Sequence, residues 1–120
     1  MTSDYRQITS DINAKLKEMR SEVPESMQGF QKMAQAIHSD GALSAKTKEL
    51  IATALGVAAR CQGCLGFHAQ ACVRMGVTRP EFEEMLQVAM YMGGGPSVMT
   101  AAEALQAYEE FGGEKAEKVV

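Results

Sequence analysis

The sequence predicts an all-α fold of about six helices, and three observations support this prediction. Apolar residues recur at steps of three and four along almost the whole chain of 120 residues, which is the period of an amphipathic helix. Short stretches with proline or glycine interrupt this pattern and mark the ends of helices. Strand-like alternation of apolar and polar residues is missing from the sequence. The length corresponds to one domain, which we place at residues 1–113, followed by a flexible tail at 114–120.

The first three expected helices occupy the N-terminal half of the chain. An apolar stripe runs from Tyr5 to Val23, and Pro24 then suits the first turn of a second helix. That helix ends near Ile37, and the break "SDGALS" leads to Ser44, a favourable N-cap for the third helix. The third segment, "AKTKELIATALGVAAR", is apolar around most of its circumference. We therefore expect neighbouring helices or another subunit to cover it on several sides.

Three more helices are expected in the C-terminal half. The fourth carries the cysteines and ends at Gly76, a residue type that is common just beyond a helix. Thr78 and Glu81 have the spacing of a capping box at the start of the fifth helix. The apolar stripe of the fifth helix consists of Phe82, Met85, Leu86, Ala89 and Met92. The glycines at 93–95 and Pro96 separate it from a last helix over roughly residues 97–111.

Composition excludes several classes of function. The net charge of −3 and the isoelectric point near 5.4 provide no basic surface, so we expect no nucleic-acid partner. No segment approaches the roughly 18 apolar residues of a membrane span, and the polar N-terminus lacks the pattern of a signal peptide. Three cysteines, an odd number, do not suit an exported disulfide scaffold. We expect a cytoplasmic protein with no membrane partner.

All three cysteines lie in the segment "RCQGCLGFHAQAC", residues 60–72, together with one of the two histidines. Core packing is the best interpretation of Cys72, because it shares a helical stripe with Leu65 and Ala69. A zinc site fits poorly. Cys61 and Cys72 would lie about 16 Å apart along one helix, whereas zinc needs each ligand within about 2.3 Å. We therefore expect neither a metal nor another cofactor.

Redox chemistry uses every part of the pattern Cys61-x-x-Cys64-x-x-x-His68. The first turn of a helix favours a thiolate over a thiol through its unpaired N–H groups and its dipole. Cys64 and His68 are four residues apart and are neighbours on one helical face, so the imidazole can accept the proton of the thiol. Cys61 lies one turn before Cys64 and can close a disulfide with it. The sequence thus predicts a nucleophile, a base and a resolving thiol within eight residues.

Two stretches, "KELIATALGVAARCQGCLGFHAQA" and "GVTRPEFEEMLQVAMYMGGGPSVMTAAEALQAYEEF", resemble the AhpD-like alkylhydroperoxidase branch of the carboxymuconolactone decarboxylase family. The resemblance covers roughly residues 24–112. It rests on Glu49, twelve positions before Cys61, on the CxxCxxxH motif and on the glycine-rich break before the last helix. It implies an AhpD-like helical fold with the CxxC motif at the start of a central helix.

The same resemblance implies a thiol peroxidase that reduces hydrogen peroxide or organic hydroperoxides. In such an enzyme Cys64 attacks the peroxide, Cys61 resolves the sulfenic acid as a disulfide, and His68 and Glu49 relay the proton. A lipoyl- or thioredoxin-like dithiol would supply the electrons. A homo-oligomer is also implied, as a dimer, a trimer or a hexamer built as a trimer of dimers.

Several alternatives stay open from the sequence. Gly63 stands where several members of the family carry a second histidine. Glu49 and His68 would not meet in a straight antiparallel hairpin, so they need crossed helices or another subunit, and the alternative for Glu49 is a solvated glutamate in a first helical turn. For His38 a position at a helix end is the simplest reading. The alternative functions are a decarboxylase-like lyase acting on a lactone acid and a non-catalytic oligomer switched by redox state.

Overall fold

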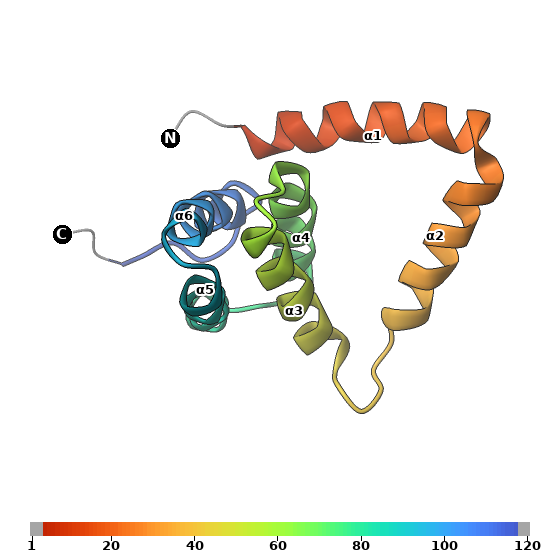
Figure 1. Cartoon of the computed structure of the whole chain (residues 1–120). Coiled ribbons are helices and arrows are strands. Elements are labelled where there is room, and N and C mark those ends of the chain that lie inside the picture. The colour runs from red at the N-terminus through yellow and green to blue at the C-terminus, as the bar shows by residue number, and fades with distance from the viewer. Residues whose placement is uncertain (1–3, 118–120) are drawn as a thin grey trace.

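The computed structural model describes residues 4–117, in which six helices follow one another along the chain (Figure 1). The helices are α1 (Tyr5–Glu22), α2 (Pro24–Ile37), α3 (Ala45–Ala58), α4 (Gln62–Arg74), α5 (Arg79–Gly93) and α6 (Gly95–Glu110). Residues 4–117 contain no strand, and the all-α prediction is confirmed. The last three residues of the expected flexible tail lie outside the described residues. None of the described helices is long and apolar enough to cross a membrane.

Helices α3 to α6 form the body of the molecule, and α1 lies across one end of it (Figure 1). Helix α3 packs against α4 and α5, and α4 packs against α6. The rings of Phe82 on α5 and Tyr108 on α6 stack with their centroids 4.6 Å apart. The core around them is mostly aliphatic, with many alanines that allow the helices to approach closely. Its other members include Val57, Leu65, Ala69, Cys72, Leu86, Ala104 and Ala107.

Helix α1 is attached to the body near its N-terminus. Tyr5 is fully buried, and its backbone N–H donates to the Glu110 carboxylate at 2.7 Å. The guanidinium of Arg6 donates to the backbone carbonyl of Glu110 and lies 5.1 Å from the centroid of the Phe111 ring. These contacts join the first turn of α1 to the last turn of α6.

Two glycines of α4 allow α1 to cross this helix closely. A Cβ atom on Gly66 would lie 2.6 Å from the Cγ2 atom of Thr9, and one on Gly63 would lie 2.8 Å from the Cδ1 atom of Ile12. Both distances are shorter than real contacts of this kind. Side chains at these positions would therefore force α1 or its residues to shift.

Helix α2 stands apart from the body. It turns back at Val23 and leads away from α1 on the far side of a gap from α3 and α4 (Figure 1). None of its residues is buried, and Phe30, Met33 and Ile37 are 68%, 60% and 51% exposed. The sequence predicted this helix and its apolar stripe, but no described part of the chain buries the stripe.

The break before the last helix is shorter than the sequence predicted. Helix α5 includes Gly93 and α6 begins at Gly95, so Gly94 alone connects them, with a positive φ of 75°. The prediction was wrong because Pro96 fits within the first turn of α6, where its missing N–H is not needed. Gly93 has a different purpose, since a Cβ atom there would overlap the side chain of Ser97.

Burial differs from the prediction at Met92, and the expected cover of α3 by another subunit stays a prediction. Met92, which the sequence placed on the buried stripe of α5, is 75% exposed because no described element covers its side of the last turn of this helix. Helix α3 buries Thr53 and Val57, but Ile51 and Leu55 remain 45% and 65% exposed. The body therefore covers one side of α3 only.

Candidate active site

Cys61 and Cys64 are joined by a disulfide at the start of α4. Cys61 is the N-cap of the helix, Cys64 lies in its first turn, and their Cα atoms are 5.1 Å apart. The Cys61 sulfur accepts a hydrogen bond from the backbone N–H of Cys64 at 3.1 Å. One of the N–H groups that have no partner within the helix is thus directed at a sulfur atom. Both residues are half-buried, so the pair lies at the edge of the fold.

The turn between α3 and α4 determines where this pair lies. The N–H groups of Arg60 and Cys61 donate to the carbonyls of Val57 and Gly56, both at 3.1 Å, which is the hydrogen-bond pattern of a Schellman motif. Arg60 has a left-handed backbone conformation with φ of 55°. The Thr100 hydroxyl of α6 also donates to the Val57 carbonyl, at 2.8 Å. Backbone bonds and a neighbouring helix therefore fix the turn from both sides.

Gly56 brings α3 close to the cysteine pair. A Cβ atom on this glycine would lie 3.0 Å from the Cβ atom of Cys64. That distance is tighter than almost all real contacts between such atoms. The backbone of α3 thus forms one wall against Cys64, and a larger residue at position 56 would move that wall.

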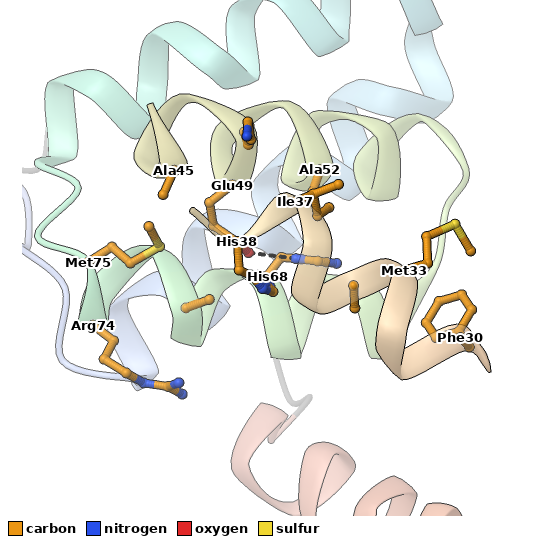
Figure 2. A pocket seen from close by; sticks show the side chains of 13 residues that line it. Phe30, Met33, Ile37, His38, Ala45, Glu49, Ala52, His68, Arg74 and Met75 are labelled. Atoms are coloured by element: carbon orange, nitrogen blue, oxygen red, sulfur yellow. Dashed lines mark hydrogen bonds and ion pairs between the residues drawn. The ribbon is translucent and has the colours of Figure 1, made fainter. Parts of the chain in front are cut away.

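Glu49 and His68 meet within a single chain. The Oε1 atom of Glu49 lies 2.6 Å from the Nδ1 atom of His68, as the dashed line in Figure 2 shows. The Glu49 side chain is only 8% exposed, so its interpretation as a solvated glutamate is wrong. An ionised carboxylate can only accept, which assigns the hydrogen to Nδ1 and leaves the Nε2 lone pair free. The crossing of α3 and α4 thereby fixes the orientation of the imidazole.

A cavity of about 460 Å³ lies beside this pair, between α2 on one side and α3 and α4 on the other (Figure 2). Glu49 and His68 line its inner wall, and apolar side chains of α2 face them across the cavity. The other lining residues are Phe30, Met33, Ala34, Ile37, His38, Ala45, Lys48, Ala52, Ala71, Arg74 and Met75. The sequence analysis missed this cavity because three helices contribute to it. The signal was the apolar stripe of α2, which had no assigned partner.

Cys72 belongs to the core, as the sequence predicted. It is fully buried, and its sulfur lies 3.4 Å from the Thr53 hydroxyl. Burial raises the pKa of the Cys72 thiol from 9.0 to about 11, so the thiol stays protonated at neutral pH. A thiol of this kind is inert, which separates Cys72 from the Cys61–Cys64 pair.

Two other positions from the sequence analysis have clear places in the structure. His38 caps the C-terminus of α2, as predicted, and also lines the cavity. Gly63 faces Ile12 of α1, and a histidine at this position would have to displace the Ile12 side chain. The close passage of α1 thus accounts for the glycine here.

Comparisons with known proteins identify the family. The sequence model of the carboxymuconolactone decarboxylase family matches residues 24–107. An uncharacterized protein of Cupriavidus necator is 37% identical over 109 residues, which cover 91% of this chain and 96% of that protein. Uncharacterized protein 4 in the cox locus of Paracoccus denitrificans is 32% identical over 84 residues, which cover 70% of this chain and 76% of that protein.

Two crystal structures of this family resemble the chain. The apo form of a family member from Legionella pneumophila has a TM-score of 0.88 and 57% identity, covering 89% of this chain and 96% of that one. A family member from Thermotoga maritima, with a suggested part in the antioxidative response, has a TM-score of 0.76 and 27% identity. That match covers 85% of this chain and 87% of the other. The fold, the relatives and the matched residues agree, and the chain belongs to the carboxymuconolactone decarboxylase family.

Proposed function

We propose that this protein is a thiol-dependent peroxidase that reduces hydrogen peroxide or organic hydroperoxides through a Cys61–Cys64 dithiol and disulfide cycle. The proposal rests on one observation. Two sulfurs that can bond to each other lie at the start of α4, one turn before a histidine that is fixed by a carboxylate. The suggested antioxidative part of the Thermotoga maritima relative points in the same direction.

The first half of the cycle oxidises Cys64. The Nε2 atom of His68 takes the proton of the Cys64 thiol, and the Glu49 carboxylate stabilises the resulting imidazolium. The thiolate then attacks one peroxide oxygen, so that an S–O bond forms while the O–O bond breaks. The departing alkoxide takes the proton from His68 and leaves as an alcohol, or as water when the substrate is hydrogen peroxide. Cys64 is now a sulfenic acid.

The second half of the cycle resolves the sulfenic acid. The Cys61 sulfur attacks the sulfur of Cys64, the S–S bond forms and the S–O bond breaks, and the hydroxyl group leaves as water with the Cys61 proton. A lipoyl- or thioredoxin-like dithiol then reduces the disulfide by thiol–disulfide exchange and becomes a disulfide itself. Such carriers are reduced in the cytoplasm, and we place the protein there.

The cavity beside His68 supports a role for organic hydroperoxides. Its volume of about 460 Å³ falls within the range of small-molecule sites, and most of its lining side chains are apolar. An alkyl group in this cavity would be removed from water, which favours binding by about 25 cal/mol for each Å² of apolar surface buried. Hydrogen peroxide has no group that would gain from such a cavity.

Cysteine variants test the proposal directly. We expect Cys64→Ser to abolish peroxide consumption in the presence of a dithiol, because this variant lacks the attacking sulfur. Cys61→Ser should complete a single turnover and leave a sulfenic acid that dimedone traps. Cys72→Ala is the matched control and should retain turnover, because Cys72 is buried in the core and its thiol stays protonated at neutral pH. Undiminished peroxide consumption by Cys64→Ser would contradict the proposal.

The same preparations distinguish the alternative functions. Turnover of a lactone acid that survives alkylation of the reduced cysteine pair would favour a decarboxylase-like lyase. Reversible assembly on oxidation, without peroxide turnover, would favour a redox-switched oligomer. A peroxidase instead loses its activity on alkylation, and the loss should follow the modification of Cys64.

A further inference from the structure

Three helices of this chain end in the same kind of turn, and only the turn at the cysteine pair lacks a glycine. After α4 and α6 the left-handed residues are Gly76 and Gly112, with φ of 78° and 95°. Their hydrogen bonds repeat the Schellman pattern that follows α3. After α3 the left-handed residue is Arg60, which is the only non-glycine residue with a positive φ between residues 4 and 117.

An arginine is an unfavourable residue for this backbone conformation. Glycine adopts it without a steric penalty, whereas the Cβ atom of any other L-residue approaches the following carbonyl and destabilises the turn. The hydrogen bonds of the turn come from the backbone N–H groups of Arg60 and Cys61, so a glycine would form the same turn. The Arg60 side chain is exposed and directly precedes Cys61 in the sequence. Local stability thus does not explain the arginine, and its position suggests a role at the disulfide.

We infer that Arg60 is a positioning residue whose fixed positive charge favours the thiolate forms of Cys61 and Cys64 in the reduced protein. The inference rests on the proposed function, because a thiolate is the reactive form in both halves of the cycle. A cation about 8 Å from a thiolate in largely aqueous surroundings shifts its protonation by about half a pH unit. The charge adds to the effect of the N–H groups at the start of α4.

Other charged groups around the pair have partners of their own or lie further along their helices. On α4 and α3 these groups are His68 and Glu49, which pair with each other. On α1, Asp11 and Lys15 flank the Ile12 contact, where Asp11 accepts from Gln7 and Lys15 pairs with Glu18. Residues 95–102 of α6 carry no charge, and Glu103 beyond them accepts from the Tyr5 hydroxyl. Within the first turn of α4 no residue is charged. Arg60 is therefore the cation closest to the pair along the chain.

The test is the rate of alkylation of the reduced protein by iodoacetamide as a function of pH. Cys72 is buried and stays protonated at neutral pH, so the reaction reports on Cys61 and Cys64. For Arg60→Gly we expect the midpoint of the profile to rise by about half a pH unit at low salt, and the difference to shrink in about 0.5 M salt. Arg60→Lys keeps the charge and should keep the wild-type midpoint.

Thermal unfolding distinguishes the effect of the Arg60 charge from the effect of its left-handed backbone conformation. Arg60→Gly relieves the left-handed arginine and should raise Tm by roughly 2–4 °C while it makes the thiols less reactive. Gly112→Arg is the matched control, because a Cβ atom there meets nothing within 4 Å and the backbone position is equivalent. It should lower Tm and leave the alkylation profile unchanged.

Two results would overturn the inference. One is an unchanged alkylation midpoint in Arg60→Gly, and the other is an equal shift in Arg60→Lys and Arg60→Gly. Alkylation needs no peroxide, so its outcome is independent of turnover. The alkylation midpoint can shift in Arg60→Gly even if the wild-type protein consumes no peroxide. That combination of results would contradict the peroxidase proposal and leave the role of Arg60 in place.

Discussion

The contact between Glu49 and His68 exists only in the folded structure, because the two residues lie on different helices. The Glu49 carboxylate is almost fully buried, and its Oε1 atom contacts the Nδ1 atom of His68, nineteen positions further along the chain. Loss of the partner of a buried carboxylate strongly destabilises the folded protein. The pair therefore holds the imidazole in one orientation and one tautomer, with Nε2 free for proton transfer.

We expect Glu49→Gln to lower kcat/KM for peroxide by roughly ten- to a hundredfold. The amide fills the same space but carries no charge to stabilise the imidazolium that forms when His68 accepts the Cys64 proton. Steady-state kinetics with a dithiol donor would measure the loss, and circular dichroism would verify the fold. Glu25→Gln, at the exposed first turn of α2, removes the same charge away from the site and should have no effect. Equal activity of the two variants would exclude Glu49 from the proton relay.

The local part of the site could be predicted from the sequence, because helical spacing alone relates Cys61, Cys64 and His68. The contact with Glu49 could not be predicted in the same way, since it depends on the angle at which α3 crosses α4. The left-handed backbone conformation of Arg60 could not be predicted either. Arginine rarely occupies the left-handed region, so its residue type gave no signal there.

At the scale of elements, a charge pair links the starts of α3 and α5. The Lys46 ammonium lies 2.8 Å from the Oε1 atom of Glu81, and this same oxygen accepts the backbone N–H of Thr78 at 2.8 Å within the capping box of α5. The hydrogen bond with Lys46, reinforced by the one from Thr78, lowers the pKa of Glu81 from 4.5 to about 2. Folding therefore favours the ionised carboxylate of Glu81.

This contact predicts a specific loss of stability in acid. Because the pKa of Glu81 is lower in the folded chain than in the unfolded chain, the contribution is complete above about pH 4.5 and disappears as the pH falls toward 2. Between pH 5 and pH 2.5 we expect Tm to fall further in the wild type than in Glu81→Gln. Glu84→Gln, on the exposed face of the same helix, should follow the wild type. Parallel Tm curves for the wild type and Glu81→Gln would show that the pair does not stabilise the fold.

The six helices and the capping box of α5 could be predicted from the sequence, but the boundary between α5 and α6 could not. The capping box expected from Thr78 and Glu81 is present with both of its hydrogen bonds. The glycines at 93–95 looked like a long break, but only Gly94 adopts the positive φ that connects the two helices. Residue type alone does not distinguish a glycine that makes a turn from one such as Gly93, which avoids a clash with Ser97.

At the scale of the whole molecule, α2 lacks the packing that normally stabilises a helix. It has 14 residues and buries none of them, and helices of this length are marginal in water on their own. Its stripe contains Phe30, Met33 and Ile37, each more than half exposed. We propose that a second copy of the chain packs against α2 in a homo-oligomer and covers the parts of this stripe that do not face the cavity. Other exposed apolar residues that a second copy can contact are Leu55, Val88, Tyr91, Met92 and Met99.

Sedimentation velocity tests this proposal. We expect the wild type to sediment as a species larger than the 13.0 kDa monomer, and Phe30→Glu to weaken self-association by about tenfold or more, because it places a charge in the apolar stripe. Gln31→Glu adds the same charge at an exposed position of the same helix that does not line the cavity, and it should leave the assembly intact. A wild-type protein that stays monomeric at micromolar concentration would contradict the proposal.

The sequence predicted the stripe on α2 but not where it would lie. The cavity became visible only with the structure, because Phe30 and Met33 face His68 and Glu49 across space that no local pattern describes (Figure 2). Periodicity identifies the apolar face of a helix but not the surface opposite that face.

The Cys61 sulfur accepts the backbone N–H of Cys64 as the N-cap of α4 and is also bonded to the Cys64 sulfur. An anionic acceptor forms a shorter and stronger hydrogen bond than a neutral one. In reduced molecules whose Cys61 is a thiolate, we therefore expect the amide of Cys64 to be held more tightly and to exchange more slowly with solvent deuterium. Deuterium exchange at this amide would then distinguish reduced from oxidised molecules.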